Sequence, residues 1–194
     1  MASPIGHSLA GATIYLWSIK PGKEQLAGFL RQRWKVISLF AILANLPDVD
    51  FILGWLMTGD PNAYHHRWTH SFVAVAGASI LGAFVFKIRP GLAANWFWCF
   101  AAVGSHLLID FFTGPELGWQ RTYGMPLLWP FSDAMFQSPV SLVVGPKHHE
   151  LSHLLSLHNW VWGAWEALVF GAILLVTAMN RRGPRKDSVS RNQA

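Results

Sequence analysis

Apolar residues occur along this chain in five long runs separated by short polar or basic segments. The runs cover residues 3–19, 34–57, 71–86, 92–112 and 159–180. Helices of these lengths cross, or nearly cross, the apolar core of a bilayer, which is about 30 Å thick. The pattern predicts an all-α, polytopic membrane helical bundle with about five transmembrane helices. We expect residues 1–180 to form one membrane-embedded domain and residues 181–194 to form a basic, disordered cytoplasmic tail.

Two polar interruptions divide this apolar pattern. The second run contains Asn45-Leu46-Pro47-Asp48-Val49-Asp50, and proline disfavours a helical conformation at the residue before it. We therefore expect the helix to break there and to start again after Pro47. The segment 113–158 is predicted to be a long mixed loop.

The composition also favours a membrane protein. Of 194 residues, 52% are hydrophobic and 13% are charged, about half the charged share of a typical soluble domain. The single cysteine, Cys99, excludes an intrachain disulfide and a cysteine-based zinc cage, and its apolar surroundings indicate a packing role. The net charge of +5 could indicate nucleic-acid binding. The basic residues flank the apolar runs instead, so we expect membrane lipids and no nucleic acid as partners.

The basic residues are distributed unevenly between the two predicted sides of the membrane. Twelve of the fifteen Lys and Arg residues lie in the 20–35 loop, the 87–89 turn and the C-terminal tail, leaving Arg67, Arg121 and Lys147. The positive-inside rule makes the larger group cytoplasmic. The N-terminus and all nine histidines are then predicted to lie toward the outer face.

The stretch His65-His66-Arg67-Trp68-Thr69-His70-Ser71 is unusually rich in imidazole. Because His66 and His70 are four residues apart, they would share one face of a helix and could converge on one metal ion. The alternative is a solvated polar loop whose histidines are incidental.

Two further pairs have metal-ligand spacing. His106 and Asp110 are four residues apart, and Asp48 and Asp50 are two apart beside the proline break. Unpaired carboxylates in a bilayer are costly, and a cation removes that cost. The alternatives are that the two aspartates near Pro47 cap a helix, and that His106 and Asp110 form a buried hydrogen-bonded pair.

Candidate ligands from five segments are predicted to lie at one depth. Each stands 13 to 17 residues from a cytoplasmic basic flank, which is about 20–25 Å along a helix. These residues are His7, Asp48, His70, His106 and Glu166. Their common depth predicts a shared centre just inside the outer interface, with Glu166 as a ligand or as a residue supporting the ligands.

Imidazole and carboxylate ligands without thiolate suit zinc first, with manganese or iron as alternatives, and they are compatible with a two-metal centre. The predicted metal ligands are His7, Asp48, Asp50, His66, His70, His106, Asp110 and Glu166. Such a centre activates water for attack on an ester or phosphoester.

Three residues are predicted to be catalytic. Asp48 or Asp50 could act as the general base where it is not fully coordinated. The planar guanidinium of Arg67 fits a phosphate or carboxylate of a substrate, or else it pairs with a carboxylate of the protein. The pattern assigns no role to His65, His148, His149, His153 and His158.

A set of motifs resembles the YdjM-like family of inner-membrane, metal-dependent hydrolases, some of which are described as LexA-regulated. The motifs are His7, Leu46-Pro47-Asp48-Val49-Asp50, His66-Arg67 with Thr69-His70-Ser71, Ser105-His106-Leu107-Leu108-Ile109-Asp110 and Leu128-Trp129-Pro130-Phe131-Ser132. The resemblance covers residues 5–180 and implies a bacterial or archaeal inner-membrane hydrolase. The order of the acidic and histidine motifs is also similar to that of zinc-dependent phospholipase C, which has a multi-zinc site on an all-helical fold. The later His-x-x-x-Glu element of that group has no match here.

The expected function is therefore hydrolysis of an ester or phosphoester by metal-activated water. A lipid or lipid-linked substrate is favoured because the site would lie at headgroup depth. One alternative is a non-enzymatic metal-binding or transport protein, but the predicted cytoplasmic helix halves are nearly uniformly apolar and offer no ion path. The other is an assembly protein with a structural metal, whose site would be closed and would not need Arg67.

Overall fold

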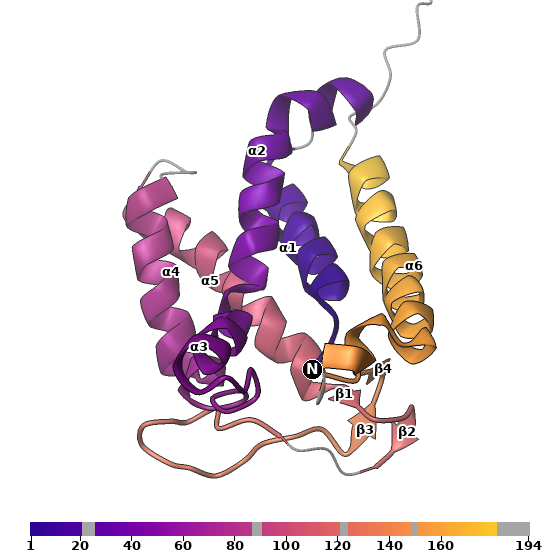
Figure 1. Ribbon diagram of the computed structural model, residues 1–194. Coiled ribbons are helices and arrows are strands. Elements are labelled where there is room, and N and C mark those ends of the chain that lie inside the picture. Colours follow the sequence, from indigo (N-terminus) through magenta and orange to yellow (C-terminus); the bar gives the residue numbers. More distant parts are fainter. Residues whose placement is uncertain (21–25, 87–90, 121–123, 149–150, 182–194) are drawn as a thin grey trace, which may run out of the picture.

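The computed structural model describes residues 1–20, 26–86, 91–120, 124–148 and 151–181, and these are mostly helical (Figure 1), which confirms the helical part of the predicted fold class. The α-helices are α1 (Pro4–Ser18), α2 (Leu26–Ala44), α3 (Val49–Thr58), α4 (Phe72–Phe86), α5 (Leu92–Phe111) and α6 (Leu157–Asn180). Short 3-10 helices are η1 (Leu46–Asp48), η2 (Trp68–His70) and η3 (Leu151–Leu155). The strands are β1 (Thr113–Gly114), β2 (Gly118–Trp119), β3 (Val140–Ser141) and β4 (Val143–Val144). β1 pairs in parallel with β4, and β2 pairs antiparallel with β3.

Helix α1 lies at the centre of the bundle. It packs against α2, α5 and α6, while α4 packs on α5 (Figure 1). A Cβ atom at Gly11 would overlap the backbone carbonyl of Phe40, so glycine allows α1 and α2 to approach closely. Such small-residue contacts are typical of helices that pack within a membrane.

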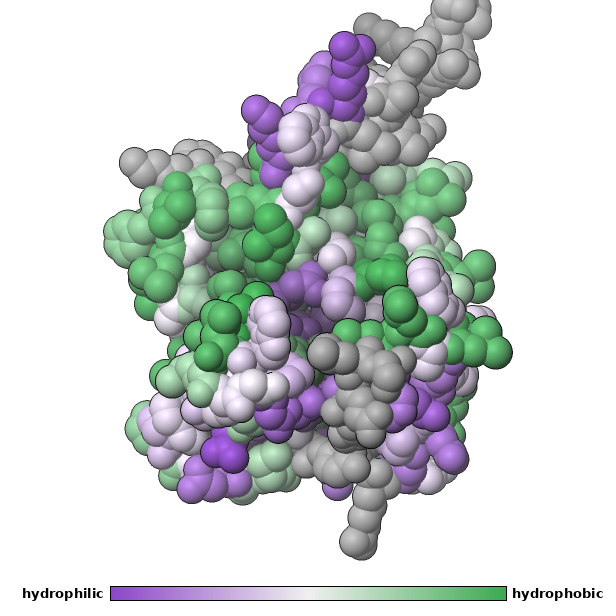
Figure 2. Space-filling model, in the orientation of Figure 1, coloured by the Kyte–Doolittle hydropathy of each residue, from purple (hydrophilic) through white to green (hydrophobic). Residues whose placement is uncertain are grey.

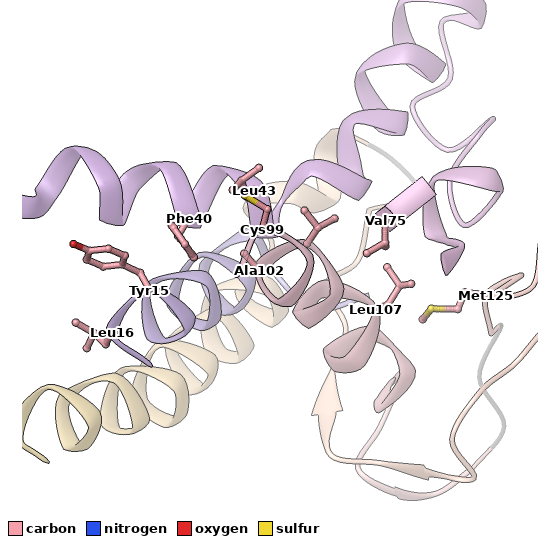
Figure 3. Packing of buried hydrophobic residues seen from close by; sticks show 10 residues of the cluster. Tyr15, Leu16, Phe40, Leu43, Val75, Cys99, Ala102, Leu107 and Met125 are labelled. Carbon is pink, nitrogen blue, oxygen red and sulfur yellow. The ribbon is translucent and has the colours of Figure 1, made fainter. Parts of the chain in front are cut away.

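The hydrophobic core follows the contacts of α1, α2 and α5. Tyr15, Phe40, Leu43 and Ala102 are buried there, and Figure 3 shows their side chains between these three helices. Cys99 is a free, fully buried cysteine of the same core, so its predicted packing role is confirmed.

The predicted break in the second apolar run is present. Helix α2 ends at Ala44, η1 contains Pro47, and α3 begins at Val49. The described parts of the two helices form a pair bent by 57°. Because of this break, Asp48 lies at the end of η1 and Asp50 in the first turn of α3, rather than both within one continuous helix.

The surface is suited to a membrane. On the face seen in Figure 2, a broad band of hydrophobic residues crosses the helices, and hydrophilic residues gather toward the end that carries the strands and again at the opposite end. Helices α5 and α6 are long and apolar enough to cross a membrane, and the bent α2–α3 pair would make a third span. Helix α4 is a shorter apolar helix. Two or three candidate membrane spans thus agree with the predicted membrane bundle, while five spans stay a prediction.

Several helix ends that border basic segments of the sequence meet at one end of the bundle. The end of α1, the start of α2, the end of α4 and the end of α6 lie at one end of the bundle (Figure 1). The Arg181 guanidinium donates a hydrogen bond to the Ile19 carbonyl there, at 3.0 Å. The η2 segment and the strands lie at the opposite end. The tail after Arg181 lies outside the described residues.

Candidate metal centre

Four side chains converge near the end of the bundle that carries the strands. They come from η1, η2 and α5, and we refer to them as the four-ligand group: Asp48, His70, His106 and Asp110. The Nε2 atom of His106 lies 3.3 Å from Asp48 Oδ1, 3.2 Å from Asp110 Oδ2 and 3.3 Å from His70 Nε2. The Nε2 atom of His70 lies 3.6 Å from Asp48 Oδ1 and 3.7 Å from Asp110 Oδ2.

These spacings match the requirements of a small tetrahedral cation. Zinc binds nitrogen and oxygen ligands at about 2.0–2.2 Å, so neighbouring ligands of a tetrahedral site are about 3.3–3.6 Å apart. The four-ligand group therefore already has nearly the spacing that one zinc-type cation needs.

His106 is oriented by the end of α2. Its Nδ1 atom lies 2.8 Å from the Ala44 carbonyl oxygen. The last carbonyls of a helix lack partners within that helix, and a carbonyl oxygen only accepts hydrogen bonds. The proton therefore sits on Nδ1, and the Nε2 lone pair points toward Asp48 and Asp110. The helix break before Pro47 thus serves the site twice, by placing Asp48 and by presenting this carbonyl.

Asp50 supports the histidines of the central stretch. Its Oδ2 atom lies 3.3 Å from His70 Nδ1 and accepts a hydrogen bond of 2.6 Å from the Thr69 hydroxyl. Its Oδ1 atom lies 3.2 Å from His65 Nδ1. A carboxylate behind an imidazole fixes the tautomer and ring orientation of a metal ligand. Asp48, in contrast, occupies the N-cap position of α3 but makes no capping hydrogen bond with its side chain. Helix capping therefore does not account for Asp48.

His66 reaches the centre by a route that differs from the helical one predicted. Residues 61–66 form turns, His66 has a φ of +55°, and η2 begins only at Trp68. The prediction that His66 and His70 share a helix face is therefore wrong, although a tight turn still brings their ring centroids within 4.8 Å. The Nδ1 atom of His66 donates to the Gly124 carbonyl at 3.0 Å, and its Nε2 atom lies 3.9 Å from Asp110 Oδ2.

His7 lies against the four-ligand group on the α1 side. Its ring is fully buried and stacks on His106, with centroids 3.8 Å apart. Its Nε2 atom is 3.3 Å from Asp110 Oδ1, and neither ring nitrogen has a hydrogen-bond partner. The other oxygen of Asp110 thus faces the four-ligand group while this one faces His7.

Glu166 is buried on α6, at the start of α1. It accepts hydrogen bonds from the Ser3 backbone amide at 3.0 and 3.1 Å and from the Ser3 hydroxyl. Ser3 is the N-cap residue of α1. The backbone amide of the preceding residue, Ala2, donates a hydrogen bond to Asp110 at 2.7 Å. The structure does not bring Glu166 into the clusters of possible ligand atoms among the described residues. It ties α6 to the N-terminal segment that contacts Asp110.

Arg67 lies on the surface beside these histidines. Its side chain is exposed, and the described part of the chain shows no hydrogen bond or ion pair for it. The alternative of pairing with a protein carboxylate is therefore not observed within that part.

The buried polar atoms of the centre test whether a cation fits. Both carboxylate oxygens of Asp48, Oδ2 of Asp110 and Nε2 of His66 are buried without a hydrogen-bond partner. Burying polar acceptors without partners costs several kcal/mol each, by an estimate of about 2–7 kcal/mol per group. A divalent cation would satisfy them together, so the donor set fits zinc-type coordination.

The histidine stretch itself shows opposing electrostatic effects. Burial lowers the pKa of His66 and of His65, which keeps these rings neutral and able to offer a lone pair. Burial also acts to lower the pKa of His70, but the carboxylates of Asp48 and Asp50 outweigh it and leave this pKa raised. The centre therefore attracts positive charge at His70.

The remaining histidines lie elsewhere. His148 Nδ1 lies 2.6 Å from Asn62 Oδ1, and His158 Nε2 lies 3.1 Å from the Gly145 carbonyl. His153 belongs to η3, and His149 lies outside the described residues.

Sequence reasoning missed the groups that orient the ligands. The Thr69 hydroxyl and the carbonyls of Ala44 and Gly124 all contact carboxylates or imidazoles of the centre. Thr69 lies within the histidine stretch, so its position was a usable signal. A backbone carbonyl has no signal in residue type, because every residue carries one.

Comparison with known proteins gives one match. The family model described as YdjM inner membrane protein matches residues 1–184, a range that contains every residue of the centre. Neither the curated proteins nor the solved structures contain a match to the chain.

Proposed function

The chain belongs to the YdjM inner membrane protein family, and from this premise we propose that it is a membrane-bound, metal-dependent hydrolase. Its substrate is an ester or phosphoester of a lipid or lipid-linked molecule, and its metal is zinc. The observation that carries the proposal is the spacing of 3.2–3.7 Å among the nitrogen and oxygen atoms of the four-ligand group.

The proposed topology has five spans, with the bent α2–α3 pair counted as one, and the centre toward the outer face. Its support is the position of the basic residues. Lys20 follows the end of α1, Arg31 lies in the first half of α2 and Arg181 follows the end of α6. These parts of the helices lie at the end of the bundle opposite the strands (Figure 1). Positive residues favour the cytoplasmic side, so the η2 end would face outward.

The proposed chemistry divides the work among the residues of the centre. A divalent cation supplies Lewis acidity and activates water for attack on an ester or phosphoester. His70, His106 and Asp110, which are all buried, would hold this cation. Asp50 keeps His70 in the required tautomer through Oδ2.

Asp48 and Arg67 are the residues proposed to act nearest the substrate. Asp48 has both oxygens free of hydrogen bonds, whereas both oxygens of Asp50 already contact other side chains. Of the two aspartates, Asp48 is therefore the better placed to take a proton or a cation. The exposed guanidinium of Arg67 offers two parallel donors to an anionic group.

An apolar groove beside Asp48 supports a substrate with a hydrocarbon chain. The groove has a volume of about 410 Å³ and is lined mainly by apolar side chains of α2 and α3. Its lining residues include Ile42, Val49 and Ile52, with Ser8 and Asn45 as the polar members beside Asp48. Ligand pockets commonly measure about 300–1,000 Å³, so part of a lipid chain fits this space.

The test is hydrolysis by the purified protein in lipid nanodiscs. Release of headgroup and of fatty acid is measured over a panel of phosphoester and ester lipids, before and after chelation and after zinc is restored. We expect activity to be lost on chelation, to return with zinc, and to be absent in His106→Asn. His148→Asn is the matched control, because its ring contacts Asn62 outside the four-ligand group.

Two outcomes would contradict the proposal. If the protein binds metal stoichiometrically but hydrolyses none of the lipids, the non-enzymatic metal-binding alternative is favoured. Hydrolysis that persists after complete removal of metal would separate the activity from this centre.

A further inference from the structure

We propose that the centre holds two cations, the second bound by His65, Asp50 and Asp48, with Asp48 bridging both. The proposal extends the metal centre on which the proposed function rests, but it does not require that the protein hydrolyses anything. It assigns a ligand role to His65, for which the sequence pattern gave none.

The first support is geometric. One ligand atom from each of Asp48, Asp50 and His65 lies within 4.8 Å of the other two. The closest pair is Asp50 Oδ1 and His65 Nδ1, 3.2 Å apart, which is also near the spacing of about 3.3 Å for two ligands on one zinc-type cation. Three protein ligands are the usual number for a zinc site that keeps a position open to water or substrate.

The second support is the set of lone pairs that remain unused. Asp48 offers only one oxygen, Oδ1, to His70 and His106 at 3.3–3.6 Å, yet both of its oxygens are buried without a hydrogen-bond partner. A bridging carboxylate uses one oxygen for each metal.

Charge gives the third support. The carboxylates of Asp48, Asp50 and Asp110 are packed among histidine rings, and the last two are fully buried or nearly so. One divalent cation leaves these three carboxylates with one net negative charge, which the N-terminal ammonium near Asp110 offsets in part. Two divalent cations leave a single positive charge, and an anionic phosphoester would neutralise it.

The exposure of the ligands gives the second cation a position. Asp48, which both cations would share, is 11% exposed, and among the other ligands only His65 has exposed side-chain surface, at 7%. Phe51 stacks on His65 with ring centroids 4.0 Å apart and so holds that ring at the rim. The second cation therefore lies nearer the surface than the first and should be released first.

The test counts metal in the purified full-length chain. Wild type saturated with zinc should hold two equivalents after gel filtration, and His65→Asn should hold one. His148→Asn is the matched control: its ring meets His65 edge to face at a centroid distance of 5.4 Å, and it should keep two. With manganese in place of zinc, wild type should give an exchange-coupled electron paramagnetic resonance signal, and His65→Asn the uncoupled signal of a single ion.

A chelator titration of wild type covers the case in which His65→Asn fails to fold. The two equivalents should leave in two steps, the weaker one without loss of helicity. A single equivalent at saturation, or two equivalents retained by folded His65→Asn, would overturn the proposal. Two coupled ions without any lipid hydrolysis would instead leave the second site intact and contradict only the proposed function.

Discussion

The Asp50 carboxylate lies directly behind the His70 imidazole, with Oδ2 and Nδ1 3.3 Å apart and both side chains fully buried. The same oxygen accepts the Thr69 hydroxyl, so its position is fixed from two directions. This relationship explains how a short 3-10 helix can present a metal ligand with a defined orientation, because the carboxylate sets which ring nitrogen carries the proton.

Removing the carboxylate charge behind His70 should weaken metal binding without unfolding the chain. For Asp50→Asn we expect the zinc affinity of the four-ligand group to fall by about 10–100-fold, the usual effect of losing a residue that orients a metal ligand, in addition to the loss of the second cation that Asp50 is proposed to bind. Competition with a chromophoric chelator measures this affinity. Asp60→Asn makes the same chemical change on an exposed carboxylate and should have no effect. Equal zinc affinity in Asp50→Asn and wild type would mean that His70 does not need this support.

Metal content should depend on the members of the four-ligand group. His70→Ala and Asp110→Ala each remove one of four converging atoms and should lower bound metal strongly. His148→Ala should matter little, since its Nδ1 atom contacts Asn62. Elemental analysis of the purified variants checks this. Unchanged metal stoichiometry in both His70→Ala and Asp110→Ala would show that the four-ligand group is not a metal site.

A substitution of Glu166 tests whether this residue is a metal ligand or only stabilises the fold. Its hydrogen bonds to Ser3 tie α6 to the start of α1, so Glu166→Ala should lower the free energy of unfolding by about 1–3 kcal/mol, the cost of leaving buried donors unsatisfied. The metal content of the folded fraction should stay that of wild type. Thermal unfolding in detergent gives the first quantity and elemental analysis the second. Lost metal in a protein of normal stability would restore Glu166 to the ligand set.

The contrast between Glu166 and His106 shows how far the sequence could predict this site. Residues four apart on one helix face each other whatever surrounds the helix, so the pair His106 and Asp110 could be predicted from spacing alone. Counting residues from a basic flank gives depth along a helix but no rotation about its axis. Glu166 contacts the N-terminal segment whose Ala2 amide donates to Asp110, yet it faces Ser3 and not the four-ligand group.

The histidine stretch shows a second limit. Spacing suggested a helix for His66 and His70, but the structure uses a turn with a positive φ at His66. The two rings still meet, because a tight turn can bring residues four apart together as a helix does. The helix break at Pro47 was predictable from the restriction that proline imposes on the residue before it. The pairing of the freed Ala44 carbonyl with His106 depends on tertiary packing and was not.

Topology follows from the same division of the bundle into two ends. A reporter fused after Ala194 should read cytoplasmic, and one placed within the 113–158 loop should read outside, because twelve of fifteen basic residues belong to the first side. Alkaline phosphatase and green fluorescent protein fusions report the two sides in opposite senses. Swapped signals would turn the centre toward the cytoplasm and leave its geometry unchanged.

Arg67 tests whether the centre acts on a substrate. It adjoins His66 in the chain, its side chain is exposed, and a guanidinium cannot bind a cation, so a role at this position requires an anionic partner. Arg67→Lys keeps the positive charge but loses the planar pair of donors. We expect hydrolysis to fall by roughly 10–1,000-fold, the range for losing one positioned electrostatic donor.

The metal content and thermal stability of Arg67→Lys should stay at the wild-type level. Within the described part of the chain, the Arg67 side chain makes no hydrogen bond or ion pair with a proposed metal ligand. Arg181→Lys, at the opposite end of the bundle, makes the same change where the guanidinium donates a hydrogen bond to the Ile19 carbonyl, and it should hydrolyse at the wild-type rate. Full activity in Arg67→Lys would exclude a contact with the substrate. Loss of metal would instead make Arg67 part of the support of the centre, and the structural-metal alternative would then account for the site better than catalysis does.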